Sequence, residues 1–165
     1  MIRKTGIILT FWLFSLVLFS ADYASNSVLS QGKWIQLRVD SNAVYKLTYE
    51  DIKAMGFSDP AKIKLHGYGG WIMEQDFRKP YTDDLPEVSV WMNKGNDGVF
   101  GAGDYLLFYG RGVVKWAYNS NNNLFEQENN PYANYGCYFI TESAQGPKEI
   151  PLQNTEANEI GRAHV

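Results

Sequence analysis

The sequence contains few of the residues that build metal centres or disulfides: there are one cysteine and two histidines in 165 residues. Because Cys137 has no partner within the chain, no intramolecular disulfide can form and stability must come from packing. The chain also has no excess of basic residues, because its 15 Lys and Arg are outnumbered by 18 Asp and Glu, which gives a formal net charge of −3. A nucleic-acid partner requires a basic face, so we expect none.

A long hydrophobic run occurs only at the start of the chain. Arg3 and Lys4 precede an apolar run over 7–19, and small polar residues follow it. About 13 apolar residues are too few to cross a bilayer comfortably, since a spanning helix needs ~20. The pattern predicts a signal peptide over 1–25 and therefore export, and a retained membrane anchor is the alternative.

From residue 32 onward, apolar residues repeat with period two far more often than with the helical period. Ile35, Leu37 and Val39, for example, alternate with polar residues, which is typical of a half-buried strand. The segments that read as strands are 33–40, 43–48, 62–70, 88–92, 104–110, 113–118 and 136–141. Such short strands separated by turn residues predict a mainly β fold, an antiparallel sandwich or barrel-like domain over 32–141.

One short helix is expected at about residues 49–55. Thr48 can cap it, Glu50 and Asp51 suit its positively polarised first turn, and Gly56 can end it. A helix of under three turns is not stable alone, so it must dock on a sheet.

Two segments read as loops because they lack any period. The first, 75–87, contains two prolines, and the second, 119–132, is polar and rich in asparagine. The segment 113–118 follows 104–110 after only two residues, a spacing close to that of a hairpin.

The pattern fades after Thr141. We expect 142–158 to be a linker or the start of a truncated next segment. The last seven residues, EIGRAHV (159–165), resemble the translation of a common sequencing adapter. They are expected to be an artefact at the end of a fragment, which leaves His66 as the only genuine histidine.

The stretch NKGNDGVFGAGD (93–104) partly follows the rhythm of a calcium loop. Asn93, Asp97 and Asp104 occupy positions 1, 5 and 12 and are the candidate ligands. Gly95 offers no side chain at position 3, and Asp104 replaces the usual glutamate. The alternative is a glycine-rich turn, and no cofactor is expected elsewhere.

Catalytic groups are few. A Cys137–His66 pair would supply a nucleophile and base, but Cys137 shares a face of its strand with Phe139, so we expect a packed core thiol instead. Asp83, Asp84 and Glu87 form an acidic cluster that could supply paired carboxylates, but they lie in a proline-containing loop, where a solvated turn is the ordinary explanation.

Glycine-rich stretches occur at HGYGG (66–70) and GRG (110–112). A phosphate cradle would be followed by the start of a helix. Neither stretch opens a helix, so strand ends and bulges are expected there.

Aromatic residues make up 15% of the chain. In the strand 104–110, Leu106 and Phe108 face one way while Tyr105, Leu107 and Tyr109 face the other. A strand that is apolar on both faces is usually covered on both sides. The alternative is a row of solvent-facing rings that binds carbohydrate.

Six segments in this order resemble a known family: 32–57, 62–70, 83–92 (DDLPEVSVWM), 97–112 (DGVFGAGDYLLFYGRG), 116–119 and 130–141 (NPYANYGCYFIT). Together they resemble the start of the PorU-type proteins, the gingipain-like sortases of the type IX secretion system. The resemblance covers roughly residues 32–141.

This resemblance implies a secreted cysteine peptidase or transpeptidase at the outer membrane or cell surface of a Gram-negative bacterium, which removes the C-terminal sorting signals of exported cargo. In such proteins the catalytic Cys and His lie in an α/β domain further along the chain. No position here matches that catalytic motif, so no catalytic residue is assigned.

The expected function is therefore that of a non-catalytic N-terminal accessory domain. Its expected partners are the downstream peptidase domain of the same protein and other components of the type IX system, with Tyr105, Tyr109 and Trp116 as candidate contacts. One alternative is an autonomous carbohydrate- or surface-binding β module. Another is a small hydrolase that uses Asp83 and Glu87.

Overall fold

A computed structural model describes residues 23–76 and 78–151. Most of the expected signal peptide and all of the adapter-like segment lie outside these residues. The described part contains one short α-helix, α2 (Tyr49–Ala54), and two 3₁₀ turns, η1 (Val28–Ser30) and η2 (Pro60–Lys62). None of the helices in this part is long and apolar enough to cross a membrane.

Nine strands make up the rest of the regular structure in the described residues. They are β1 (Trp34–Val39), β2 (Ala43–Thr48), β3 (Ile63–Gly69), β4 (Glu87–Val88), β5 (Trp91–Asn93), β6 (Tyr105–Gly110), β7 (Val114–Asn119), β8 (Leu124–Asn129) and β9 (Gly136–Glu142). All the pairings between these strands are antiparallel.

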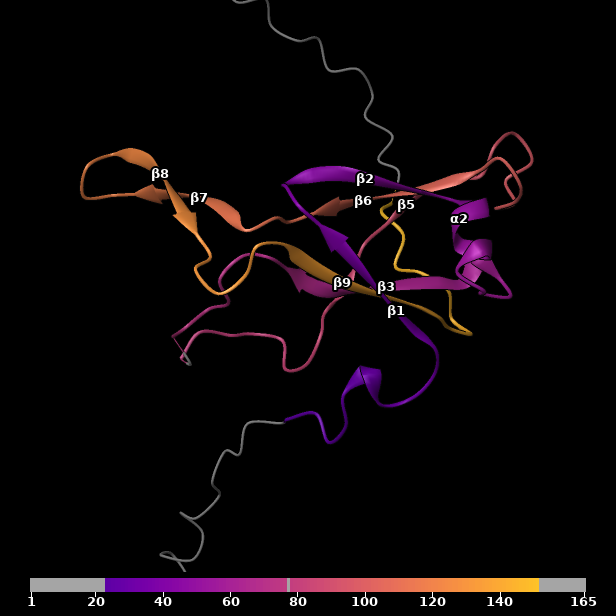
Figure 1. Cartoon of the computed structure of the whole chain (residues 1–165), viewed down its shortest axis with the longest axis horizontal. Coiled ribbons are helices and arrows are strands. Elements are labelled where there is room, and N and C mark those ends of the chain that lie inside the picture. Colours follow the sequence, from indigo (N-terminus) through magenta and orange to yellow (C-terminus); the bar gives the residue numbers. More distant parts are fainter. Residues whose placement is uncertain (1–22, 77, 152–165) are drawn as a thin grey trace, which may run out of the picture.

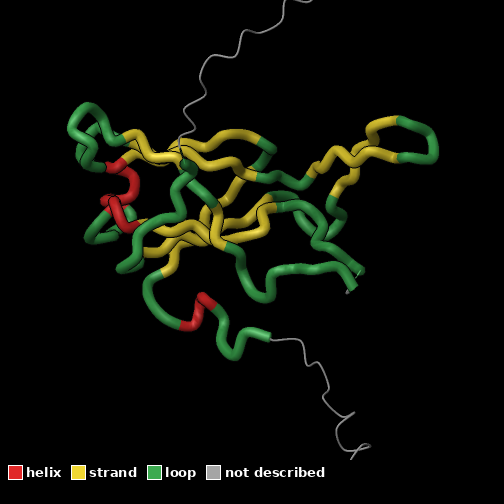
Figure 2. Tube along the Cα trace, turned by 180° about the vertical axis from the view of Figure 1, so that it is seen from behind, coloured by secondary structure: helices red, strands yellow, loops and turns green. Residues whose placement is uncertain are grey.

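The strands form two facing sheets and a separate hairpin (Figure 1). One sheet has the order β1-β9-β3-β4 and the other the order β2-β6-β5. The β7–β8 hairpin projects from one end of this sandwich, as the view from behind also shows (Figure 2). The expected antiparallel β fold with one short helix is confirmed, and the sheets do not close into a barrel.

The core lies between the two sheets. Tyr138 and Ile140 of β9 and Leu65 of β3 meet Leu106 and Phe108 of β6, and all five are nearly inaccessible to solvent. The rings of Phe108 and Tyr138 pack edge to face, with centroids 5.5 Å apart. Burying each of these side chains contributes roughly 1.5–3 kcal/mol, so this layer is the main source of stability.

The helix is fixed by its N-terminal cap. Thr48 Oγ1 accepts a hydrogen bond from the Asp51 N–H, and the Thr48 N–H donates to Asp51 Oδ2 at 3.0 Å. This reciprocal capping box is typical of helix starts. Ile52 buries its side chain completely against the sheets, and Gly56 follows with φ of +81°, which ends the helix near the expected position.

The glycines of 66–70 form a bulge, as expected. The register between β3 and β9 shifts between His66 and Gly69, and Gly67 and Gly69 both have positive φ. Residues with a Cβ rarely adopt such backbone angles.

The phase of β9 is the reverse of the expected one. Tyr138 and Ile140 are buried, whereas Cys137 and Phe139 lie on the opposite face and are half-buried. Because β9 is apolar on both faces, alternation alone cannot show which set faces the core. The prediction of a core position for Cys137 was therefore wrong.

The segment 119–132 was expected to be a loop, but it contains β8. This strand pairs with β7, with Tyr118 opposite Phe125, and β7 does not pair with β6 as its spacing suggested. Every residue of β8 is exposed, so no alternation between polar and apolar residues marks it as a strand. The segment after β9 also makes a backbone contact. Residues 148–150 pair with Val90, which donates to the Lys148 carbonyl and accepts from the Ile150 N–H, so this segment lies beside the start of β5.

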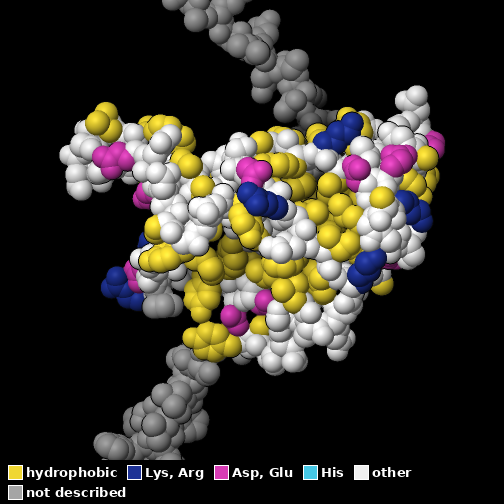
Figure 3. Space-filling view, viewed as in Figure 1, with side chains coloured by type: hydrophobic (Ala, Val, Ile, Leu, Met, Phe, Trp, Pro, Cys, Tyr) yellow, Lys and Arg dark blue, Asp and Glu magenta, His cyan; other side chains and the backbone are white. Residues whose placement is uncertain are grey.

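Apolar side chains also reach the surface. Figure 3 shows them gathered in the band between the two sheets and on the projecting hairpin. On the hairpin these include Trp116, Tyr118 and Phe125, each more than half exposed.

Candidate functional site

Three backbone segments cross at short distances where β3 and β6 end and β9 begins. The Gly70 N–H donates to the Arg111 carbonyl at 2.8 Å. A Cβ on Gly70 would lie 2.8 Å from the carbonyl carbon of Gly112, and one on Gly136 would lie 2.2 Å from the Arg111 oxygen. Only glycine permits such close approach, and the crossing places Trp71 and Arg111 side by side.

Trp71 is held in a fixed orientation. Its Nε1 donates to Asn42 Oδ1 and to the Val114 carbonyl, both at 3.1 Å. Asn42 in turn donates from Nδ2 to the Val114 carbonyl at 2.6 Å and accepts from the Gly112 N–H at 2.8 Å. The turn after β1, the connection before β7 and the indole thus form one hydrogen-bonded unit.

The guanidinium of Arg111 lies over this indole, with 4.6 Å between its central carbon and the ring centroid. Stacking of this kind is a favourable cation–π contact. The backbone N–H of Arg111 donates to the Tyr138 hydroxyl at 2.9 Å. Among the described residues, no carboxylate forms an ion pair with Arg111.

A hollow of about 320 Å³ opens beside this stacked pair. Its walls are Tyr68, Trp71, Ile72, Met73, Glu74, Pro80, Tyr81 and Arg111. The Tyr68 hydroxyl donates to the Thr82 carbonyl, which joins the β3 side of the hollow to the segment that contains Pro80 and Tyr81. We call this the Trp71 hollow.

A second hollow of about 430 Å³ shares Tyr68 and Arg111 with the Trp71 hollow. It continues past Val88 and Tyr109 to Ile150. Arg111 therefore lies on the border of two neighbouring depressions.

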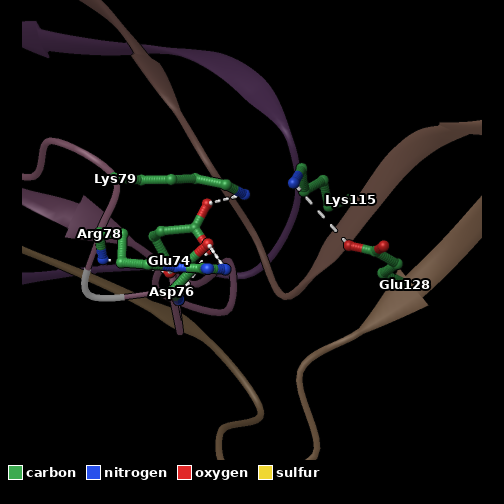
Figure 4. Close-up of polar contacts among 6 residues, drawn as sticks. All are labelled: Glu74, Asp76, Arg78, Lys79, Lys115 and Glu128. Atoms are coloured by element: carbon green, nitrogen blue, oxygen red, sulfur yellow. Dashed lines mark hydrogen bonds and ion pairs between the residues drawn. The ribbon is translucent and has the colours of Figure 1, made fainter.

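The charges near the rim are mostly paired (Figure 4). Glu74 lies 2.7 Å from Lys79 Nζ, and this hydrogen bond holds the pKa of the glutamate below its ordinary value. Arg78 pairs with Asp76 at 2.8 Å. Lys115 and Glu128 face each other across the hairpin at 3.8 Å. Among the described residues that line the Trp71 hollow, Arg111 is the only cation.

The structure places the three predicted contact residues on two different surfaces. Tyr105 and Tyr109 lie on the outward side of β6, and Tyr109 is 51% exposed. Trp116 lies on the β7–β8 hairpin and is 58% exposed.

The outward side of the β2-β6-β5 sheet is partly exposed: Val44, Lys46 and Tyr109 are exposed, and Trp91, Tyr105 and Leu107 are half-buried. Lys46 lies over the Tyr105 ring, with 4.2 Å between its Nζ and the ring centroid, and Trp91 packs against the same ring. We call this surface the outer aromatic face; it comprises Val44, Lys46, Trp91, Tyr105, Leu107 and Tyr109.

The candidate calcium ligands take part in turns of their own loop. Each accepts a hydrogen bond from a nearby backbone N–H: Asn93 from Gly95, Asp97 from Val99, and Asp104 from Gly101. Within 23–76 and 78–151, no group of three or more His, Cys, Asp and Glu is arranged to hold a metal. The calcium loop stays a prediction.

Cys137 and His66 have separate partners. The Cys137 sulfur lies 2.9 Å from Gln36 Nε2, while His66 Nδ1 lies 3.2 Å from the Leu85 carbonyl. The imidazole also packs edge to face against Trp34. These contacts orient the two side chains toward different neighbours.

Asp83 and Glu87 also have separate roles. Asp83 accepts a hydrogen bond from the Ala24 N–H at 2.5 Å. Glu87 pairs with Lys64 at 3.1 Å and accepts from the Lys148 N–H at 3.0 Å. The two carboxylates thus stabilise contacts between segments.

Sequence reasoning did not identify Trp71 or Arg111 as site residues. Their signal was present, because Trp71 directly follows HGYGG and Arg111 lies between the glycines of GRG. Pairs of glycines beside an aromatic and a cationic residue mark places where backbones approach closely and fix the neighbouring side chains.

Comparison with known proteins gives a similarity among solved structures. No family model and no curated protein sequence matches the chain. The crystal structure of dimeric latent PorU from Porphyromonas gingivalis is similar, with 38% sequence identity and a TM-score of 0.66 over 76% of this chain. The chain therefore contains a PorU-like domain, and it covers 11% of that larger protein.

Proposed function

We propose that this chain is a non-catalytic N-terminal accessory domain of a secreted, cell-surface cysteine peptidase or transpeptidase of the PorU type, which processes the sorting signals of type IX cargo. The observation that carries the proposal is the 38% identity to PorU over most of this chain, combined with coverage of only 11% of that protein. A small part of a large enzyme is most simply one of its modules.

The non-catalytic role is supported by the separation of the reactive groups. Cys137 and His66 each bond to other residues, and so do Asp83 and Glu87. A nucleophile needs a base within hydrogen-bond reach, and paired carboxylates must flank one reacting bond.

We propose that the outer aromatic face packs against the downstream peptidase domain, with Tyr105 and Tyr109 at its centre. Exposed aromatic patches with few charges are typical of the buried centres of interfaces. Trp116, on the hairpin, would provide a second contact, and components of the type IX machinery are further proposed partners.

The test uses the complete protein that the gene encodes, with Tyr109→Ser and Val44→Ser combined in the outer aromatic face. Both side chains are more than half exposed, so the module itself should keep its fold. We expect less mature cargo at the cell surface and easier proteolytic release of the module. The control is the pair Tyr132→Ser and Val99→Ser, whose side chains are also well exposed but lie elsewhere. Equal behaviour of the two double variants would contradict the proposed docking.

A second candidate function is an autonomous carbohydrate- or surface-binding module. The observation that favours it is the exposed pair Trp116 and Tyr118, which share one side of β7. Exposed rings at alternate strand positions can stack on sugar rings. Glycan-array binding by the chain that disappears in Trp116→Ala would support this function instead.

A further inference from the structure

We propose that the Trp71 hollow is a binding site for a peptide segment that carries a large apolar or aromatic side chain next to a carboxylate. This inference concerns a site on the module itself and does not depend on the proposed function.

The walls of the Trp71 hollow suit an apolar side chain. Six of its eight lining residues are apolar or aromatic, and the aromatic ones are Tyr68, Trp71 and Tyr81. A volume of about 320 Å³ lies at the lower end of the range for ligand sites, which is enough for one large side chain and its backbone.

The electrostatics of the hollow select a carboxylate. Of the two charged residues in its walls, Glu74 is already paired with Lys79 at 2.7 Å. Arg111 has no ion-pair partner among the described residues, although the nearby Arg78 and Lys115 both have one. A guanidinium offers two parallel N–H donors that match a carboxylate, so an acidic ligand complements it.

The site is built before any ligand arrives. Two acceptors fix the Trp71 indole, and the backbone of Arg111 is held by the Tyr138 hydroxyl and by Gly70. Stacking on the indole restricts the guanidinium further. Trp71 and Arg111 therefore have less side-chain freedom to lose on binding, which favours affinity.

The second hollow extends the site beyond one residue. It shares Tyr68 and Arg111 with the Trp71 hollow and continues to Val88, Tyr109 and Ile150. An extended peptide could therefore place a neighbouring residue there. A sugar would need several free polar groups around its hydroxyls. In the Trp71 hollow, Glu74 is paired with Lys79, the Tyr68 hydroxyl donates to Thr82, and the Trp71 N–H donates to Asn42 and Val114.

The test measures fluorescence polarisation of labelled peptides with the full chain. One set ends in Phe with a free C-terminal carboxylate, a second has an internal Phe-Glu pair and an amidated end, and a third has Phe-Gln and an amidated end. We expect the carboxylate-bearing peptides to bind at least about tenfold more tightly than the neutral set, because a charge-assisted hydrogen bond contributes roughly 1.5–3 kcal/mol. The first two sets distinguish a chain terminus from an acidic side chain as the source of the carboxylate.

Arg111→Gln should weaken binding of the carboxylate peptides by about tenfold or more and leave the neutral peptides unchanged. Arg38→Gln is the matched control, since Arg38 is also stacked on an aromatic ring, that of Tyr135, but lies outside both hollows. Met73→Asp, at an exposed wall position, should also weaken binding. Binding that is absent for all peptides, equal in Arg111→Gln and Arg38→Gln, or replaced by binding of neutral oligosaccharides would overturn the proposal.

Discussion

The hydroxyl of Tyr138 accepts a hydrogen bond from the backbone N–H of Arg111 at 2.9 Å, and this contact joins the two sheets at the edge of the Trp71 hollow. Tyr138 is 2% exposed. Burial raises the pKa of its phenol, and the Arg111 N–H opposes that rise in pKa. One side chain thus serves both the core and the position of the Arg111 backbone.

Tyr138→Phe removes the acceptor and leaves the Arg111 N–H without this partner. We expect the free energy of unfolding to fall by about 1–3 kcal/mol, measured by urea denaturation. Tyr109→Phe is the control, because that ring is half exposed, and it should change stability by less than about 0.5 kcal/mol. Equal losses in the free energy of unfolding for the two variants would show that the hydrogen bond from Arg111 to Tyr138 does not stabilise the fold.

Gly136→Ala should be among the most damaging single-methyl additions in the chain. The new Cβ would lie 2.2 Å from the Arg111 carbonyl oxygen, so the crossing segments must separate. We expect a loss of roughly 2 kcal/mol or more in thermal or urea unfolding. Gly101→Ala adds the same methyl where the nearest atom, the Val99 carbonyl oxygen, is 3.9 Å away, and it should be nearly neutral.

Stability should fall in acid partly through Glu142. Its side chain accepts hydrogen bonds from the hydroxyl and N–H of Ser58, and these hold its pKa below the ordinary value of 4.5. A depressed folded-state pKa contributes stability that is present above 4.5 and is lost as the pH falls through the lower folded value. Glu142→Gln should therefore flatten the pH dependence of the melting temperature below 4.5. An unchanged acid slope would contradict this assignment.

The β7–β8 hairpin should open more readily than the rest of the described fold. It is a two-stranded unit whose main cross-strand aromatic contact is Tyr118 with Phe125, at 5.4 Å between centroids. Isolated two-stranded hairpins are marginal in water. We expect its amides to exchange with deuterium faster than those of β9, and Phe125→Ala to speed exchange in β7 and β8 only. Protection equal to that of β9 would be the contrary result.

The sequence predicted the elements whose signals are local. Period-two alternation located β1, β2 and β6, and the capping residue Thr48 located α2, because a strand face and a helix cap depend on neighbouring residues. The mainly antiparallel β fold followed from the short strands and frequent turns, whereas the choice between a sandwich and a barrel stayed open until the strand order was known.

Features that depend on long-range contacts were harder to predict. Alternation in β9 did not show that Tyr138, rather than Cys137, faces the core, since both sets are apolar. The strand β8 is exposed on both sides, so its sequence does not alternate between apolar and polar residues. Trp71 and Arg111 are 40 positions apart, and only the glycine crossing brings them together.

The most direct test of the proposed docking is hydroxyl-radical footprinting of Tyr109 in the isolated chain and in the complete protein. Tyr132, which is 84% exposed and lies outside the outer aromatic face, serves as the internal reference. We expect oxidation of Tyr109 relative to Tyr132 to fall several-fold in the complete protein, because the downstream domain covers the ring. Equal oxidation of Tyr109 in both proteins would contradict the role of this face as the contact with the peptidase domain.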